Sequence, residues 1–193
     1  YSIKSPLNIG IRHLLPIMPF IYILGISSLK HWLKSNFLKT QVKFAIITFL
    51  FLWFATETIL TYPYYLSYFN QTIGTNNGWR YVTDSNYDWG QDLKRLKTFV
   101  ETNNIEKIGV DYFGGGSPKY YLNDKVEYWW SAKGDPRKDG IKWLAVSINT
   151  IQGAKGAVHA GQQRNSEDEY LWLTDPYEPY ARAGTSIFIY KLE

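Results

Sequence analysis

Two long stretches with almost no charge occupy the first third of the chain. Residues 14–29 carry no charged side chain, and residues 44–62 carry one, Glu57. A helix needs about 20 apolar residues to cross a bilayer. The second stretch is therefore long enough, and tilt or packing against other helices can make up the small deficit of the first. The pattern predicts two transmembrane helices, at about 14–29 and 44–62. Two buried helices of a soluble protein are the alternative.

The connection between these stretches, residues 30–43, is basic. It contains four lysines and no acid, and loops rich in Lys and Arg stay on the cytoplasmic side of a membrane. We therefore expect a cytoplasmic loop within a membrane part, residues 1–62, and an extracytoplasmic domain, residues 63–193. Aromatic residues after the second stretch fit the belt found at a membrane surface: Tyr62, Tyr64, Tyr65, Tyr68 and Phe69. Together these features predict a multi-pass protein of the cell membrane.

The rest of the chain alternates between short apolar runs and segments of helical period. Strands are predicted at 79–82, 107–113, 126–130, 141–148 and 185–192. Helices are predicted at 88–102, 118–122 and 166–173, and the first of these carries an apolar stripe. Strands separated by helices indicate an α/β fold. We expect a small Rossmann-like three-layer domain.

The start of the helix predicted at 88–102 is unusually polar. Asp88 fits an N-cap, with Gln91 as its capping-box partner, and Asp92 complements the helix dipole. On one continuous helix, Asp84, Asp88 and Asp92 would form an acidic ladder able to hold a divalent cation. Because Asp84 precedes the predicted helix, we expect capping rather than a metal site. A divalent cation stays open as a cofactor.

Three predicted strands end in polar or glycine-rich loops, at 84–86, 114–117 and 149–150. If the strands are parallel, these loops lie at one edge of the sheet, where α/β proteins bind ligands. Bare glycine amides and a helix start can hold an anion or sugar hydroxyls. A plain strand-to-helix turn explains the glycines equally well. The substrate-binding candidates are Asp84, Asn86, Gly114, Gly115 and Gly116.

Composition excludes several chemistries. The chain has no cysteine, which removes disulfides, Cys-ligated zinc and thiol catalysis. The formal net charge of +4 comes from the first third, because residues 60–193 carry 15 basic and 16 acidic side chains. A nucleic-acid surface is therefore not expected.

Arg12 and His13 lie just outside the first apolar stretch. Next to a bilayer, a guanidinium can fork onto the oxygens of a lipid phosphate, and an imidazole can donate or shuttle a proton. Ordinary snorkelling of long side chains to the membrane surface is the alternative. The pair is the candidate lipid-phosphate site.

Three strings carry a likeness to a known family: residues 8–20, residues 62–70 and residues 77–93. They resemble the C-terminal part of glycosyltransferase family 39-like membrane proteins of bacteria and archaea, which are related to protein O-mannosyltransferases and aminoarabinose transferases. The resemblance implies an enzyme of the GT-C type that moves a sugar from a polyprenyl-phosphate donor to a glycan or protein acceptor outside the cytoplasm. It also favours Arg12 and His13 as contacts to the lipid phosphate.

In such enzymes the catalytic carboxylate lies in the first outer loop, near the N-terminus. That loop is expected upstream of the residues given, so no catalytic residue is assigned. Two other functions stay open. The chain could be a membrane-anchored module that binds a glycan or another ligand without catalysis, or a sensor or assembly subunit.

Overall fold

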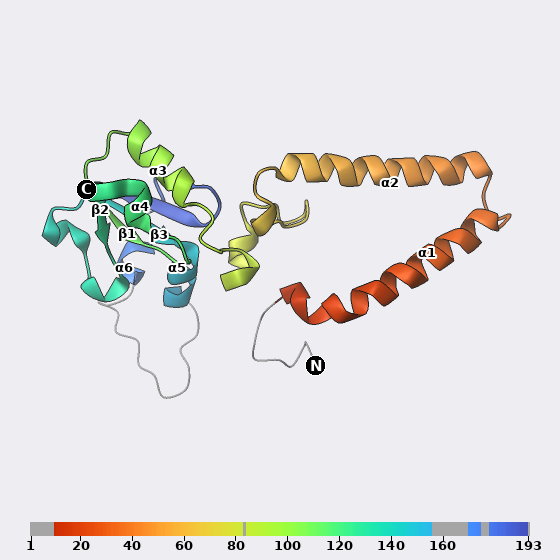
Figure 1. The fold of residues 1–193 in the computed structure, drawn as a ribbon, viewed down its shortest axis with the longest axis horizontal. Helices are drawn as coiled ribbons and strands as arrows, with labels where there is room; N and C mark the ends of the chain where they lie inside the picture. Colours follow the sequence, from red (N-terminus) through yellow and green to blue (C-terminus); the bar gives the residue numbers. More distant parts are fainter. Residues whose placement is uncertain (1–9, 83, 156–169, 175–177, 193) are drawn as a thin grey trace, which may run out of the picture. The chain divides into compact units, whose positions relative to one another are not determined.

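The computed structural model describes residues 10–82, 84–155, 170–174 and 178–192. The chain forms two compact units, residues 1–63 and residues 64–193. Figure 1 shows the first as two long helices and the second as a sheet with helices around it.

The first unit is helical. A 3₁₀ segment, Gly10–Ile17, leads into α1, Met18–Lys34, and α2 spans Thr40–Thr61. The segments Leu14–Lys34 and Thr40–Thr61 are long and apolar enough to cross a membrane, by length and composition. Helices at both predicted places are therefore confirmed, and both are longer than the sequence pattern indicated.

The basic connection is correspondingly shorter than predicted. Residues 35–39 join the helices, so of the four lysines only Lys39 lies between them, while Lys30, Lys34 and Lys43 belong to helices. The charge pattern located the turn, but lysines are good helix formers and extend both helices into it.

Lys43, a residue of α2, caps the C-terminal end of α1 with its side chain. Its side chain is only 1% exposed. Its ammonium donates to the carbonyl oxygens of Trp32 (2.7 Å), Leu33 (3.1 Å) and Ser35 (2.5 Å). The last carbonyls of a helix lack partners within the helix and carry partial negative charge. The lysine therefore satisfies these groups and fixes the turn between α1 and α2.

The second unit is built on a mixed sheet of five strands. The strand order is β2-β1-β3-β5-β4. β1 is parallel to β2 and β3, whereas β5 is antiparallel to β3 and β4. The strands are β1 Ile108–Asp111, β2 Val126–Tyr128, β3 Trp143–Ser147, β4 Ala181–Ala183 and β5 Ile187–Lys191. This confirms a mixed α/β fold.

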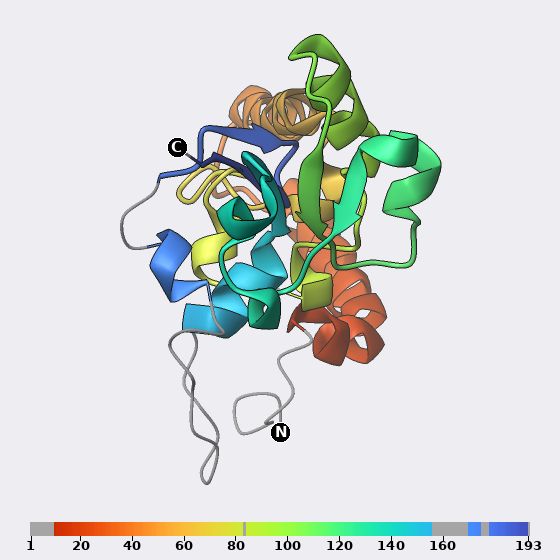
Figure 2. The same cartoon turned by 90° about the vertical axis from the view of Figure 1, so that its left-hand side faces the viewer.

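Helices cover both faces of the sheet. α3 (Leu93–Thr102) and α4 (Pro118–Leu122) lie on one side, and α5 (Ile148–Lys155) and α6 (Leu171–Thr174) on the other (Figures 1 and 2). The first pair shares a buried apolar core with residues from β1, β3 and β5, such as Val110, Ala145 and Ile189. The second pair packs on the opposite side chains of β3 and β5, such as Val146 and Phe188. The period-two alternation of β3 and β5 thus divides their residues between two cores.

One predicted strand is wrong, and another is confirmed but shorter than predicted. Residues 79–82 form no strand; Gly78–Arg80 is a 3₁₀ turn, and Trp79 packs edge-on against Phe188 at 5.2 Å between ring centres. β-branched and aromatic residues are common in strands because they pack well on a half-buried surface. The side chain of Trp79 packs in this way, but the backbone of residues 79–82 does not join the sheet. The strand predicted at 141–148 ends at Ser147, and α5 begins at once. Of the helix predicted at 166–173, residues 166–169 lie outside the described residues.

Replacing Lys43 with methionine should loosen the helical hairpin, because three helix-terminal carbonyls lose a charged donor while the apolar stem stays. We expect a loss of about 2 kcal/mol in the free energy of unfolding. Thermal unfolding in detergent micelles, followed by circular dichroism at 222 nm, measures it. Lys39→Met, which removes the same charge from an exposed position, is the control. Equal stability of the two variants would contradict the capping role.

Candidate functional site at the carboxyl edge of the parallel strands

The fold has a switch point between β1 and β3. From β1 the chain passes to β2 on one side, and then returns to β3 on the other side of β1. The segments after β1 and β3 therefore leave in opposite directions, and in open α/β sheets ligands bind at such an edge. Residues 112–117 follow β1 as a loop, whereas residues 149–150, predicted as a loop, lie in the first turn of α5, which begins directly after β3. The structure brings both segments to the same edge, because β1 and β3 are parallel.

Hydrogen bonds tie the glycine-rich loop to its neighbours. The Phe113 amide donates to the Ser147 hydroxyl oxygen at 2.9 Å, across the ends of β1 and β3. The Tyr112 hydroxyl donates to the Gly90 carbonyl at 2.8 Å and accepts from the Gly116 amide at 3.4 Å. Tyr112 therefore joins the loop after β1 to the segment 84–92, which reaches this edge from outside the sheet.

The three glycines have different roles in this loop. Gly114 has φ +144°, and a Cβ there would overlap the Tyr112 hydroxyl and the Gly90 backbone, so the fold itself requires glycine. A Cβ on Gly116 would press on the side chain of Leu93 at 2.9 Å. Around Gly115 the space is open, and the residue is exposed. Of the three, Gly115 is the one that a ligand could meet without a change in packing.

The segment before α3 does not start a helix in the predicted way. Gly90 has φ +74°, in the left-handed region, which separates Asp88 from the helix that begins at Leu93. The Asp88 carboxylate accepts from the Gly90 amide at 2.7 Å, and the Gln91 side chain accepts from the Trp89 amide at 2.7 Å. The predicted cap at Asp88 and its capping box are therefore wrong. Both side chains stabilise a tight turn instead.

The acidic ladder is excluded for the same reason. Asp84, Asp88 and Asp92 do not share one helix. Within the part of the chain that the structure describes, no group of three His, Cys, Asp or Glu residues is placed to hold a metal ion.

Asp92 is a buried anchor. One carboxylate oxygen accepts three hydrogen bonds of 2.9 Å, from the amides of Thr185 and Ser186 and from the Ser186 hydroxyl. The other oxygen pairs with Arg95 at 2.5 Å. A Cβ on Gly184 would overlap this carboxylate. Asp92 thus holds the start of α3 to the turn between β4 and β5, and its side chain makes no cap on its own helix.

Asp88 is also fully buried, but less well satisfied. No described donor reaches its second carboxylate oxygen, Oδ2. Burial raises the pKa of Asp88 from 3.8 to about 6, against the opposing effect of the hydrogen bond from the Gly90 amide. A carboxyl group with such a pKa changes its protonation state near neutral pH. Strongly shifted carboxyl groups beside a crevice are candidates for a functional role.

A half-buried carboxylate, that of Asp111, lies at the end of β1. The Asp111 carboxylate accepts from the Tyr170 hydroxyl at 2.7 Å and from Thr150 at 3.4 Å, and burial raises its pKa despite these bonds. Asn149 accepts from the Asp84 amide, while its buried Nδ2 has no partner among the described residues. The loop at 84–86 is thereby held against the residues that follow β3, although it does not end a strand.

The predicted substrate-binding residues differ in accessibility. Asp84, Gly114, Gly115 and Gly116 are exposed, and Asn86 is partly buried. Two aromatic side chains from the same segments are also exposed, Trp89 by 54% and Phe113 by 38%. The edge therefore combines amides and carboxylates with aromatic surface. The binding role of the five predicted residues stays a prediction.

Several polar residues of this edge were not singled out from the sequence. Asp111, Ser147 and Tyr170 are single polar side chains within or beside apolar runs. The signal that could have located the first two is their place at the ends of buried strands. For Arg12 and His13, the side chains lie outside the described residues, so the structure does not bear on the lipid-phosphate prediction.

No family model, no curated protein and no solved structure matches the chain. The likeness to family 39-like glycosyltransferases therefore stays a prediction.

The substitution Asp88→Asn should stabilise the protein more at pH 8 than at pH 4. Because the pKa of Asp88 in the folded state is above its unfolded value, ionisation opposes folding. The wild type loses stability as the pH rises from about 4 through about 6, and asparagine removes this loss. The gain at pH 8 should exceed that at pH 4 by about 2 kcal/mol.

Urea unfolding of the protein in micelles at the two pH values, followed by tryptophan fluorescence, checks this difference. Asp124→Asn, at an exposed carboxylate, should show no comparable pH dependence. A gain at Asp88 that does not vary with pH would contradict the raised pKa.

Proposed function

We propose that the chain is the C-terminal part of a membrane glycosyltransferase that moves a sugar from a polyprenyl-phosphate donor to an extracytoplasmic acceptor. In this proposal α1 and α2 cross the cell membrane of a multi-pass protein, and the basic turn between them faces the cytoplasm. The Rossmann-like three-layer domain lies outside and binds the glycan of the acceptor at the carboxyl edge of β1 and β3.

The observation that carries the proposal is the composition of this edge. Sugars present hydroxyl groups in fixed directions and one or two apolar ring faces. Exposed loop amides near Gly115 and the Asp84 carboxylate can meet hydroxyl groups, while Trp89 and Phe113 offer flat apolar surface. Pockets for small molecules combine such apolar walls with a few placed polar groups. The two long apolar helices favour a membrane-bound enzyme that acts on a lipid-linked donor.

A membrane-anchored module that binds a glycan without catalysis is the second candidate. Such a module would bind its ligand at the same edge and with the same residues. The Oδ2 atom of Asp88, which no described donor reaches, favours a functional role of this edge for both candidates. Transfer of sugar by the full-length protein separates the two candidates, because a binding module has no transfer activity.

Gly115→Val tests the edge. Three added carbon atoms enter open space, so folding should be unchanged, while an acceptor glycan loses access to the loop amides. In the full-length protein we expect the KM for the acceptor to rise about tenfold, which corresponds to about 1.4 kcal/mol. Ala132→Leu adds the same number of carbon atoms at an exposed position away from this edge and should leave KM unchanged. If Gly115→Val transfers sugar with the wild-type KM, the acceptor does not bind here.

Arg12→Ala tests the lipid-phosphate role. A guanidinium that binds the donor phosphate contributes charge-assisted hydrogen bonds, so its removal should lower transfer at least tenfold with folding intact. Transfer measured with a polyprenyl-phosphate sugar, together with thermal unfolding of the variant, checks both points. Lys30→Ala, which removes a positive charge elsewhere on the first helical unit, should retain transfer. Normal transfer by Arg12→Ala would remove the phosphate role.

A further inference from the structure

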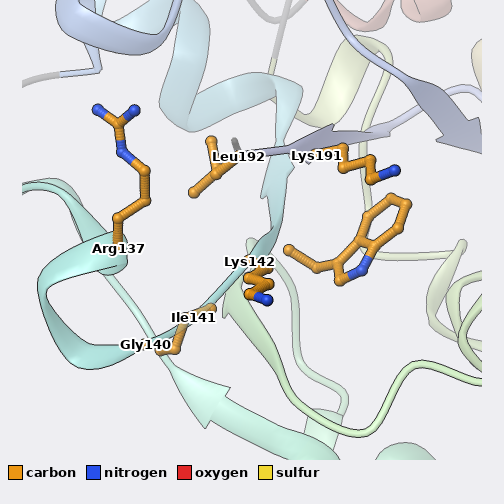
Figure 3. Close-up of a pocket in the computed structure, with 7 residues that line it drawn as sticks. Arg137, Gly140, Ile141, Lys142, Lys191 and Leu192 are labelled. Carbon is orange, nitrogen blue, oxygen red and sulfur yellow. The ribbon is translucent and has the colours of Figure 1, made fainter.

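A cavity of about 420 Å³ lies at the other edge of the sheet, where β3 begins and β5 ends. Its charged lining residues are all basic: Arg137, Lys142 and Lys191. Figure 3 shows Arg137 on one side of Leu192 and Lys191 on the other. Cavities of this size hold small organic ligands, and this one offers positive charge, with no acid among the lining residues that the structure describes.

Arg137 is held in place by a neighbouring acid outside the lining. Asp135 accepts from the Arg137 amide at 2.9 Å, and its carboxylate takes the guanidinium at 2.8 Å from Nε and 2.5 Å from Nη2. Burial alone would raise the pKa of Asp135, but the hydrogen bonds and the charge of Arg137 outweigh it and keep the pKa below its ordinary value. The acid thus stays ionised and fixes the arginine at the rim of the cavity.

The two lysines keep their charge free for a ligand. Among the described residues, no carboxylate lies within ion-pair distance of Lys142 or Lys191. The Lys191 ammonium is 5.8 Å from the ring centre of Trp143 and 6.0 Å from that of Tyr180. Such contacts orient a cation but leave its charge uncompensated.

The remaining walls are apolar. Ile141, Trp143 and Leu192 line the cavity, and Trp143 is held edge-on between Phe99 and Tyr180, with ring centres 5.9 and 5.2 Å away. A rigid aromatic wall beside positive charges suits a ligand with a ring or short carbon skeleton at one end and an anion at the other.

We propose that this basic cavity binds a phosphate monoester of about the size of a sugar phosphate. Lys142 and Lys191 supply the positive charge that binds the phosphate, Arg137 adds positive charge at the rim, and Trp143 contacts the carbon skeleton. Arginine and lysine are the side chains that proteins use for phosphate. The site does not depend on the proposed function, because its residues lie at the opposite end of β3 from the glycan-binding edge.

Calorimetric titration of the whole chain in neutral-detergent micelles tests this site, with glucose 6-phosphate as the probe and glucose as the uncharged reference. The wild type should bind the phosphate and not glucose. Lys142→Gln combined with Lys191→Gln should weaken binding at least tenfold. Lys94→Gln combined with Lys125→Gln removes the same charge outside the cavity and should change binding less than twofold.

The source of the phosphate is found by competition. Short-chain phosphatidate added to the micelles should displace the probe from the wild type if the site takes a lipid headgroup, and should leave it bound if the site takes a soluble phosphate ester. Either result is compatible with the site. Absence of binding by the wild type, equal binding of glucose, or equal weakening by the two lysine pairs would overturn the proposal.

Discussion

The second unit, residues 64–193, depends on one buried carboxylate, that of Asp92. It accepts three hydrogen bonds from the turn between β4 and β5 and pairs with Arg95 on its own helix. A buried charge is tolerated only when its partners are complete, and here they come from segments more than 90 positions apart in the chain. Because α3 and the hairpin are joined in this way, the segment before α3 is fixed at its end.

That anchor explains the arrangement of the polar edge. The segment 84–92 is held at Asp84 by Asn149, at Gly90 by Tyr112 and at Asp92 by the hairpin. Three fixed points in nine residues leave little freedom, so Asp88 is buried even though its Oδ2 has no described donor. Stability alone would favour an uncharged side chain at this position. Local departures from good packing are expected where a site serves a function.

Local patterns in the sequence predicted the helices well. Of the apolar stripe formed by Trp89, Leu93, Leu96 and Val100, the last three form the buried face of α3, whereas Trp89 is exposed and precedes the helix. The helix predicted at 118–122 is α4, with Pro118 as its first residue. Both depend only on neighbours within a few positions.

What the sequence did not predict depends on distant partners. The left-handed turn at Gly90 is packed against Tyr112, 22 positions away in the chain. Lys43, a residue of α2, caps the end of α1. Asp92 lies directly before α3, where an aspartate commonly caps a helix. Its observed role depends instead on the turn between β4 and β5, which donates hydrogen bonds to its carboxylate. For the candidate site, the polar segments were predicted, whereas the burial of Asp88 and the role of Asp111 were not, because burial is decided by the whole fold.

The two ends of β3 carry opposite electrostatic character. At its carboxyl end the polar side chains include two acids, the buried Asp88 and the half-buried Asp111, beside exposed glycines. At its amino end Lys142 and Lys191 line a cavity whose described lining residues include no acid. An anion is repelled from the first place and attracted to the second, since the interaction of charges is strongest where water is partly excluded. We propose a neutral glycan for the first edge and a phosphate ester for the second, and because the two proposed sites lie at opposite ends of β3, the two ligands do not compete for one place.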